Sequence, residues 1–446
     1  MTIKNWQPFS WEQKTIAQGV HYEDQVALTT TLMQLQALPP LVTDREVKAL
    51  KSLIHKAAQG QAFILQGGDC SELFSDCNAS QITNKFKILL QMSVILIHSL
   101  KKPVVRIGRI AGQYAKPRSS MNETIDGITL PAYRGDMING HEFTKAQRTP
   151  DPQRMLLAYQ YSALTLNYLR ALASDGFADL HHSKNWQLDF VVDAAAKKSY
   201  QLILNSVTHA LHFFESILDV KNDVVRGVQV FSSHEALHLP YEAALTSEVA
   251  PGQFYNLGTH FPWVGMRTLS LDGAHVEYLR GINNPIGIKV GPSADLDELL
   301  KILAILNPEH EAGKIVVIHR FGRAHISEKL PLLLAKLQAH KSVCAVICDP
   351  MHGNTRTTTQ GIKTRYFDDI LAELCEAFRI HQESTIALAG IHFEMTGDNV
   401  TECIGGSCGL REEDLSKTYT SLVDPRLNYQ QALEMVLKIA ELHQGL

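Results

Sequence analysis

The chain has 446 residues, of which 45% are hydrophobic and 20% are charged, and its formal net charge at pH 7 is −4. Such a chain can bury a sizeable core, and it lacks the basic excess that binding to nucleic acid or to a membrane surface normally requires. No N-terminal stretch has the apolar run of a signal peptide, the longest apolar stretch is too short to span a bilayer, and the seven cysteines include no Cys-x-x-Cys pair. We therefore expect a cytoplasmic protein that binds neither nucleic acid nor a membrane.

Eight short runs rich in β-branched and other apolar residues recur along the chain, and each ends in small or polar residues. Runs of this kind predict strands that are buried on both faces. The predicted strands are 62–70, 103–109, 227–235, 261–267, 286–292, 314–322, 343–354 and 386–397.

Helical patterns alternate with the later strands. In residues 295–306, apolar side chains recur at the spacing of one helix face, and the other patterns cover 327–339, 367–381 and 429–443. Eight buried strands alternating with helices predict an α/β fold, and the number favours a closed (β/α)8 TIM barrel over an open sheet. Because no repeat, low-complexity segment or linker divides the chain, we expect residues 1–446 to form one domain.

Two regions lie outside the alternation of strands and helices. Residues 1–58 precede the first predicted strand, and we interpret them as an N-terminal extension. The gap between the second and third strands contains residues 155–173 and 199–217, which both have apolar faces typical of helices. We therefore predict inserted helices within residues 150–225, and insertions of this kind commonly serve assembly or regulation.

Four metal-ligand side chains belong to the strand ends, where active sites of (β/α)8 barrels lie. Cys70, His352 and Glu394 lie at or near the ends of predicted strands, and Asp424 precedes the last predicted helix. One thiolate, one imidazole and two carboxylates suit manganese, iron(II), cobalt or zinc better than magnesium. Taken singly, each also has a structural explanation, namely a buried thiol, a turn residue or a helix cap. Their shared location favours a metal site.

Single cations also interrupt apolar or glycine-rich segments near the strand ends, where a strand buried on both faces should carry none. An unpaired buried cation is costly, and arginine and lysine bind carboxylates and phosphates, so a bound anion explains them best. So many cations beside a metal predict two phosphorylated substrates. The cations are Arg109, Lys116, Arg118, Arg267, Lys289 and Arg320. His234 and Glu235 are weaker candidates for positioning substrate.

These residues lie in segments that resemble the type II 3-deoxy-D-arabino-heptulosonate 7-phosphate (DAHP) synthases. "QGGDCSE", "RIGRIAGQYAKPRS", "YRGDMINGHE", "DPMHGNT" and "GIHFEMTGDNVTECIGG" occur in the family's order, and the resemblance covers essentially the whole chain. It implies a (β/α)8 barrel that condenses phosphoenolpyruvate (PEP) with erythrose 4-phosphate and water to give DAHP and phosphate. That reaction is the first step of the shikimate pathway, which leads to chorismate and the aromatic amino acids.

The resemblance also implies a role for each candidate residue. Lys116 would reach the reacting centre, Arg118 and Ser119 would hold the phosphate of erythrose 4-phosphate, and Trp263 would line the PEP site with Met266 beside it. Manganese is the metal that we expect first, with cobalt, iron(II) and zinc as alternatives. The implied metal ligands are Cys70, His352, Glu394 and Asp424, the PEP-binding residues are Arg109, Arg267, Lys289 and Arg320, and the catalytic residues are Lys116, Arg267 and Lys289.

The segment "WVGMRTLS" departs from the family's usual pattern. Met266 stands where most members have an acidic residue next to PEP, and Leu269 stands where they have an arginine. "HRFGRAHISEKLP" also differs from the usual Arg-Met-Gly pattern after Arg320. All four implied metal ligands remain, so we expect catalysis with a reduced turnover number.

The predicted insertion resembles one that forms sites for aromatic amino acids at subunit interfaces in feedback-regulated members. We therefore expect a regulated homo-oligomer, a dimer or a tetramer, with an aromatic amino acid as effector and chorismate mutase as a possible partner enzyme. Two alternatives stay open. One is a paralogue with the same chemistry in a secondary aromatic pathway, and the other is a weakly active regulatory subunit that binds PEP or an effector.

Overall fold

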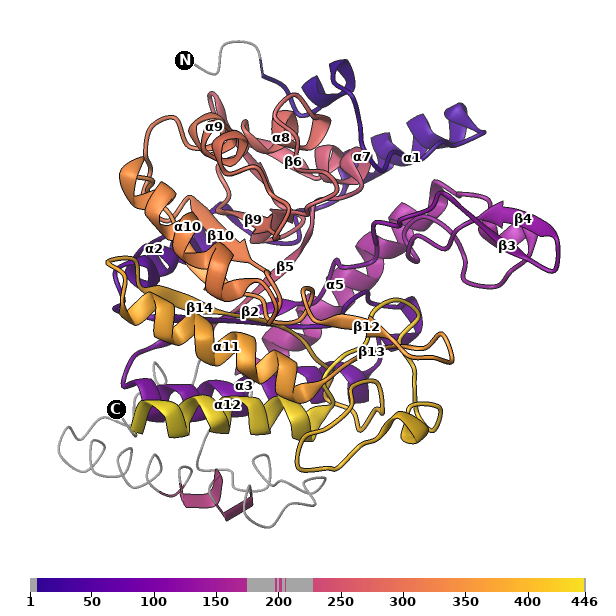
Figure 1. Ribbon diagram of the computed structural model, residues 1–446. Coiled ribbons are helices and arrows are strands. Elements are labelled where there is room, and N and C mark those ends of the chain that lie inside the picture. The colour runs from indigo at the N-terminus through magenta and orange to yellow at the C-terminus, as the bar shows by residue number, and fades with distance from the viewer. Residues whose placement is uncertain (1–5, 175–196, 199, 203–204, 206–227, 445–446) are drawn as a thin grey trace.

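The computed structural model describes residues 6–174, 197–198, 200–202, 205 and 228–444. Eight parallel strands close into a barrel in the order β1-β14-β11-β10-β9-β8-β5-β2 (Figure 1). Each lies within a predicted strand, which confirms the (β/α)8 barrel, although most of the strands end earlier than predicted and the polar residues after them lie in loops. The strands are β1 (Phe63–Gly68), β2 (Val104–Arg109), β5 (Val230–Glu235), β8 (Phe261–Val264), β9 (Ile286–Val290), β10 (Ile315–His319), β11 (Ala345–Cys348) and β14 (Leu388–Glu394).

Alternate residues of the barrel strands face opposite sides of the sheet. In β10, Val316 and Ile318 belong to the cluster that fills the barrel, whereas Val317 packs with the helices outside it. Helix α2 (Asp44–Ala58) adds Leu50 and Ile54 to the inner cluster. Part of the predicted N-terminal extension therefore packs against the barrel's core.

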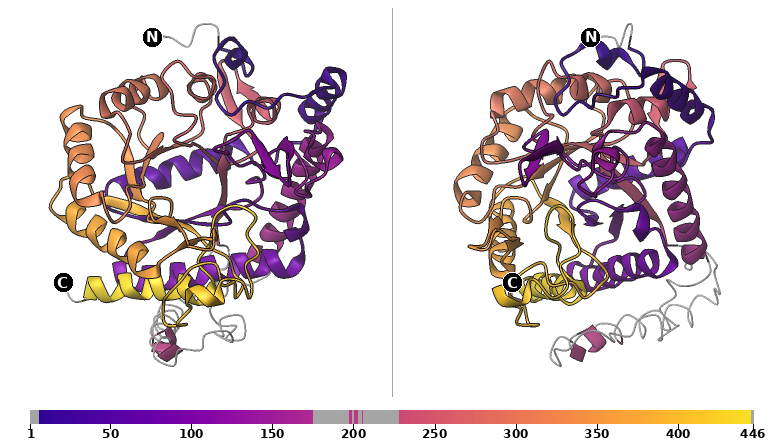
Figure 2. Two further views of the ribbon diagram at one scale, coloured as in Figure 1. Left: turned by 45° about the vertical axis from the view of Figure 1, so that its right-hand side comes forward. Right: turned by 90° about the vertical axis from the view of Figure 1, so that its right-hand side faces the viewer.

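Helices form a ring around the strands in the right-hand view of Figure 2. The predicted helix 295–306 begins one residue later than expected, because the Asp295 carboxylate accepts hydrogen bonds from the N–H groups of Asp297 and Glu298 and acts as the N-cap. The helices predicted at 327–339, 367–381 and 429–443 are confirmed within one residue at each end. The outer helices are α3 (Ala79–Leu100), α7 (Leu239–Ala244), α8 (Ala274–Leu279), α9 (Leu296–Leu306), α10 (Ile326–Ala339), α11 (Phe367–Gln382) and α12 (Tyr429–Gln444).

Helix α5 (Gln153–Ser174) confirms the first predicted insertion between the second and third barrel strands. Most of the second predicted helix, 199–217, lies outside the described residues. The remaining elements are the helices α1 (Gln25–Ala37) and α4 (Lys145–Arg148), the short 3-10 turns η1 (Ser10–Gln13), η2 (Phe74–Asp76) and η5 (Glu412–Asp414), and the hairpins β3 (Asn122–Ile125) with β4 (Ile128–Pro131), β6 (Thr246–Ala250) with β7 (Gln253–Asn256) and β12 (Thr355–Thr357) with β13 (Lys363–Arg365). Across the described ranges, no helix is both long enough and apolar enough to cross a membrane.

Candidate active site

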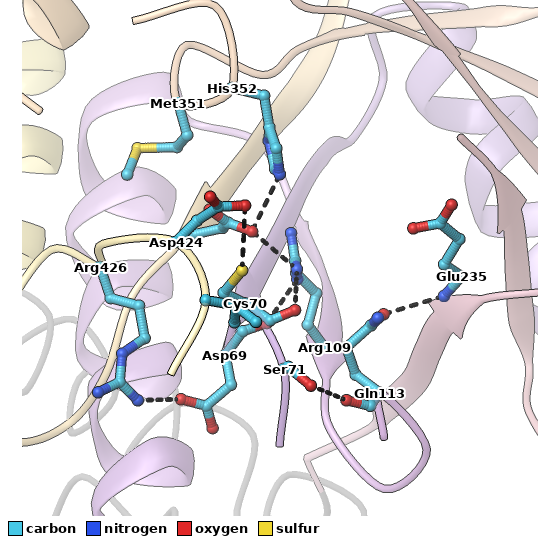
Figure 3. Close-up of polar contacts among 12 residues, drawn as sticks. Asp69, Cys70, Ser71, Arg109, Gln113, Glu235, Met351, His352, Asp424 and Arg426 are labelled. Atoms are coloured by element: carbon cyan, nitrogen blue, oxygen red, sulfur yellow. Dashed lines mark hydrogen bonds and ion pairs between the residues drawn. The ribbon is translucent and has the colours of Figure 1, made fainter. Parts of the chain in front are cut away.

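The four predicted metal ligands meet at the C-terminal end of the barrel. Figure 3 shows Cys70, His352 and Asp424 facing one another. Parallel pairing of β1 with β14 sets Gly68 opposite Glu394, and Cys70 follows two residues later. The Cys70 Sγ lies 3.6 Å from the Asp424 Oδ2, and the His352 Nε2 lies 2.9 Å from the Glu394 Oε1. Ligand atoms of Cys70, Glu394 and Asp424 all lie within 4.8 Å of one another. Barrel closure thus gathers donors that are widely separated in the sequence.

Gly68, the last residue of β1, allows β1 and β2 to approach each other. Gly68 has a φ of +147°, and a Cβ atom there would lie 2.5 Å from the carbonyl oxygen of Arg109. A larger residue would push β2 away or alter the path to Cys70. The glycine in "QGGDC" therefore helps to position both Cys70 and Arg109.

Buried ion pairs connect the loop of Cys70 to the loop of Asp424. The Arg426 Nη1 donates to the Asp69 Oδ1 at 2.6 Å, and its Nη2 donates to the Glu402 Oε1 at 2.7 Å. Asp69 immediately precedes Cys70, and Arg426 lies two residues after Asp424. The pairs therefore fix two of the predicted ligands relative to each other.

His352 is oriented by an aspartate that sequence analysis missed. The Nδ1 of His352 lies 2.7 Å from the Asp349 Oδ2, so it donates its proton there and leaves the lone pair of Nε2 toward Glu394. Burial lowers the pKa of His352, which favours the neutral ring. A neutral imidazole nitrogen and a carboxylate oxygen 2.9 Å apart are both acceptors, so a cation between them would make their approach favourable.

Lys116 brings a positive charge to the same donors. Its Nζ lies 2.6 Å from the Cys70 Sγ, 2.9 Å from the Asp424 Oδ2 and 3.6 Å from the Glu394 Oε1. Burial opposes ionisation of Glu394, but the adjacent His352 ring and the cations Lys116, Arg365 and Arg109 hold its pKa well below the ordinary value. Burial and the charge of Glu394 raise the pKa of the Cys70 thiol.

This donor set fits a divalent metal ion. Glu394 and Asp424 both have lowered pKa values, because the neighbouring cations outweigh burial, and both are therefore ionised at neutral pH. His352 presents a neutral nitrogen, and Cys70 would lose its proton when a metal binds. A nearby second group, Asp349, His352 and His392, is already engaged in hydrogen bonds with other side chains.

Two of the predicted PEP-binding cations meet on one histidine. The Arg109 Nη1 and the Lys289 Nζ lie 2.8 Å and 2.9 Å from the His392 Nε2, which accepts from both. The Nδ1 of His392 then donates to the Gln66 Oε1 at 2.7 Å. The indole of Trp263 lies 5.3 Å from the Arg109 guanidinium and 5.8 Å from the Lys289 ammonium, so it lines the same site.

The expectation that these two cations lack partners is wrong. The Arg109 Nη2 donates to the Glu394 Oε1 at 3.0 Å, and the Lys289 Nζ forms an ion pair with Asp349. Both carboxylates reach the cations from other strands, which sequence spacing does not show. A substrate anion here would join an existing network of charges and would not neutralise isolated cations.

Three other predicted cations, Arg118, Arg267 and Arg320, form the rim of the site. They match the expectation of unpaired cations better, because no carboxylate among the described residues pairs with them. The Arg267 Nη2 donates to the Ser119 Oγ at 3.1 Å, so the predicted sites for the two substrates adjoin. The Arg320 Nη2 donates to the carbonyl oxygen of His352 at 2.9 Å. The prediction of cations without a carboxylate partner therefore holds for these three guanidinium groups among the described residues.

Glu235 lies near the active-site cations, including Lys116, Lys289 and Arg109, whereas the preceding residue His234 does not. Burial raises the pKa of Glu235, although Lys116, Lys289 and Arg109 act against the rise. Its Oε1 has no hydrogen-bond partner among the residues that the structure describes. The Nε2 of His234 lies 2.8 Å from the Glu242 Oε1, so His234 is a hydrogen-bonded core residue.

Met266 occupies the space next to Arg320. The Gly291 N–H donates to the Met266 Sδ at 3.1 Å, and a Cβ atom on Gly291 would lie 2.9 Å from the Arg320 Nη1. Leu269 packs against the main hydrophobic core. Both residues that depart from the family's pattern are thus accommodated by apolar or weakly polar contacts.

Asp349 and His392 are not among the predicted site residues, although the sequence contains one signal for His392. Residues i and i+2 of a strand point to the same face, so His392 accompanies Glu394 into the site. Asp349 directly follows β11 in "CDPMHGN", three residues before His352, but its pairing with Lys289 depends on the barrel's closure.

Comparison with known proteins agrees with this geometry. Residues 6–440 match the class-II DAHP synthetase family. A protein of Neurospora crassa named phospho-2-dehydro-3-deoxyheptonate aldolase is 46% identical, with 98% of this chain and 94% of the relative covered. Proteins with the same enzyme name from Streptomyces coelicolor and Mycolicibacterium smegmatis are 44% and 40% identical, covering 97% and 92% of this chain and 96% and 88% of theirs. The chain belongs to the class-II DAHP synthetase family.

Proposed function

We propose that this enzyme is a metal-dependent DAHP synthase, which condenses PEP with erythrose 4-phosphate and water and releases phosphate. One observation carries the proposal: Cys70, His352, Glu394 and Asp424 meet beside a rim of cations. The enzyme name shared by the relatives supports the same reaction. This reaction would open the shikimate pathway to chorismate and the aromatic amino acids.

A manganese ion held by Cys70, His352, Glu394 and Asp424, or cobalt, iron(II) or zinc in its place, would supply Lewis-acid polarisation of the aldehyde of erythrose 4-phosphate. The enzyme's own side chains bind the two substrates and stabilise the charge that develops during the reaction. Arg267 and Arg320 hold PEP at the rim, with Arg109 and Lys289 deeper in the site. Arg118 and Ser119 hold the phosphate of the second substrate.

Lys116 donates a hydrogen bond to the aldehyde oxygen as negative charge develops there. The C3 atom of PEP bonds to the aldehyde carbon, the oxygen of a water molecule bonds to C2, and the bond from C2 to the phosphate oxygen breaks. Glu235, whose pKa burial raises, would exchange a proton with that water. Fixed cations also hold together two anions that repel each other in solution.

The direct test of this reaction measures phosphate release from PEP with each substrate omitted in turn. We expect release only when PEP and erythrose 4-phosphate are both present, and a seven-carbon phosphorylated product in equal amount. Release of phosphate from PEP alone would contradict a condensation and would indicate hydrolysis.

Because Met266 replaces the family's acidic residue, we expect a low turnover number. We expect the single substitution Met266→Glu to raise it. In Met266→Glu, the carboxylate would accept from the Gly291 N–H, as the sulfur does now, and would place a charge near Arg320. One hydrogen-bonded charge in the transition state is worth about ten- to a hundredfold in rate. Steady-state kinetics should therefore show a higher turnover number and a nearly unchanged Michaelis constant for PEP.

Met266→Gln is the matched control, because it has similar size and polarity without the charge. A glutamate variant slower than wild type would contradict the assignment. No measurable turnover in wild type or variant would favour the regulatory-subunit alternative.

The lowered pKa of Lys289 predicts how the Michaelis constant for PEP depends on pH. Burial lowers the pKa of Lys289 to about 8, and Arg109 acts in the same direction, while Asp349 and Glu394 oppose the shift. The ammonium that attracts PEP is therefore present below pH 8 and lost above it. The Michaelis constant for PEP should rise by up to about tenfold for each pH unit above that value.

Lys289→Arg keeps its charge at high pH and should remove this rise. A Michaelis constant that stays flat between about pH 7 and about pH 9.5 in the wild type would contradict the role of Lys289.

We also propose an aromatic amino acid as a feedback effector, with a binding site beside α5. A cavity of about 390 Å³ lies there, lined by apolar residues of α5 and β5 and by Glu46, Arg170 and His260. Arg170 and Glu46 form an ion pair at 3.2 Å, and they would pair with the carboxylate and ammonium groups of an amino acid. The apolar wall would receive the ring.

Tryptophan or phenylalanine at millimolar concentration should inhibit the wild type, and Arg170→Ala should raise the inhibitory concentration at least about tenfold with turnover retained. Lys48→Ala, which changes an exposed cation of α2 that does not line the cavity, is the matched control. If no aromatic amino acid alters the rate or the thermal midpoint, the paralogue in a secondary pathway becomes the better interpretation.

The remaining proposals concern assembly and location. Val26 and Met33 on α1 and Leu164 on α5 are exposed, which supports a homo-oligomer, a dimer or a tetramer, and such a surface would also suit chorismate mutase as a partner. All seven cysteines are free thiols, which supports a reducing compartment such as the cytoplasm.

A further inference from the structure

A further group of potential metal ligands, separate from the active site, lies on the outer side of the barrel wall. His319 ends β10 and Cys348 ends β11, and the two residues are direct neighbours in the parallel register. Both side chains point away from the barrel interior, because the residues before them, Ile318 and Ile347, belong to the inner cluster. Helices α10 and α11 cover this side of the barrel (Figure 1). Glu373 faces them from α11. The next residues, Arg320 and Asp349, belong to the active site instead.

The three side chains form a compact and fully enclosed cluster. The ligand atoms of His319, Cys348 and Glu373 all lie within 4.8 Å of one another, and each residue is 0% exposed. Phe321 stacks on His319 with ring centroids 5.6 Å apart, and His381 stacks on it at 5.8 Å. These aromatic contacts and the full burial of His319 keep water away from its ring nitrogens.

Neither nitrogen of His319 has a hydrogen-bond partner in the part of the chain that the structure describes. Native proteins rarely bury an imidazole in this way, because the lost hydration is not replaced. The Nδ1 of His381 donates to the carbonyl oxygen of Ile386 at 2.7 Å, and its Nε2 likewise has no partner among the described residues. Two imidazoles therefore keep unpaired nitrogens in one enclosed space.

Glu373 is held rigidly but has no counter-ion. Its Oε1 accepts from the N–H groups of Phe321 and Gly322 at 3.0 Å and 2.8 Å, and its Oε2 accepts from the Asn354 Nδ2 at 2.7 Å. These bonds leave one lone pair on Oε2. Within the described ranges, no lysine or arginine pairs with this carboxylate, and burial raises its pKa to about 8.

A divalent cation would resolve these features together. Its two positive charges would balance one thiolate from Cys348 and one carboxylate from Glu373, which makes the loaded cluster neutral and therefore compatible with full burial. Sulfur, imidazole and carboxylate donors together suit zinc or cobalt. His381 supplies a further imidazole beside this set.

We propose that His319, Cys348 and Glu373 form a second metal site, which binds a zinc-type divalent cation and has a structural role. The bound ion would link α11 to β10 and β11. Arg320 directly follows β10, and His352 lies in the loop after β11. The ion would therefore hold in place the strand ends that carry these two active-site residues. Because the cluster is enclosed, the metal would enter during folding and would resist chelators. The inference does not depend on the proposed function.

Cobalt as the probe distinguishes this site from the active site. The protein is produced in cells grown with cobalt and without added zinc, and is then dialysed against a chelator. A Cys70→Ser background removes the active-site sulfur, so a remaining sulfur-to-cobalt charge-transfer band reports Cys348. We expect this variant to keep stoichiometric cobalt and the band.

Adding Cys348→Ala to that background should abolish both the band and the retained cobalt. Cys375→Ala is the matched control, because Cys375 lies on α11 outside the cluster and should leave both signals unchanged. Anomalous diffraction at the cobalt edge from the Cys70→Ser protein, with the cluster intact, locates the ion even if the double variant fails to fold. Absence of chelator-resistant cobalt and of the band in Cys70→Ser would overturn the proposal, and Glu373 would then carry a proton in place of a metal.

Discussion

Replacing Cys70 with alanine should remove the chelatable metal and lower turnover by at least about 100-fold. Loss of a residue that only supports a ligand costs up to about 100-fold in affinity or activity, and loss of a ligand should cost no less. Cys70 is the only sulfur in the active-site group, and its Sγ lies 3.6 Å from Asp424 and 2.6 Å from the Lys116 ammonium. Metal content and turnover, measured on the same preparation, should fall together.

Cys77→Ala is the matched control, because Cys77 is a half-buried thiol seven residues later that donates to the carbonyl oxygen of Tyr161. This variant should retain both metal and turnover. If Cys70→Ala loses turnover but binds metal with unchanged affinity, Cys70 is not a ligand.

Replacing Lys116 with methionine should separate metal binding from catalysis. Methionine keeps the length of the side chain but removes the ammonium that would stabilise the developing alkoxide. Loss of one such donor costs about 100- to 1000-fold in turnover. The metal should stay bound, and bind more tightly, because one competing positive charge beside Asp424 and Glu394 has gone. Turnover, metal affinity and the Michaelis constant for PEP are the three measurements.

Lys363→Met is the control for this variant. The Lys363 Nζ lies 3.2 Å from the Asp424 Oδ1, but its side chain is 49% exposed, so water screens the pair and turnover should change little. A Lys116→Met variant that loses its metal would contradict the proposed division of roles.

The barrel was predictable because its strands are buried on both faces. Runs such as residues 314–322 contain no polar alternation, so they identify a parallel sheet from local sequence alone. The same reasoning placed Cys70 and Glu394 at one end of the barrel, since both end or follow strands. Helix 295–306 was predictable for a similar reason, as its apolar face and the Asp295 cap are local features.

The partners of the buried cations were not predictable, because they depend on contacts between distant segments. Arg109 pairs with Glu394, which lies 285 residues away, and Lys289 pairs with Asp349 across the barrel mouth. Sequence spacing shows which strand carries a charge, but not which opposite charge faces it after closure. The packing of α2 with the barrel core was missed for the same reason.

The most direct test of the metal-centred account titrates chelator-treated protein with manganese and follows the chelatable metal bound and the rate of phosphate release. We expect no release without metal, and a rate that rises in proportion to occupancy of one site and then stays level. The Cys70→Ala variant should show neither binding nor rate in the same range. Full phosphate release by wild-type protein that holds no chelatable metal would contradict the account.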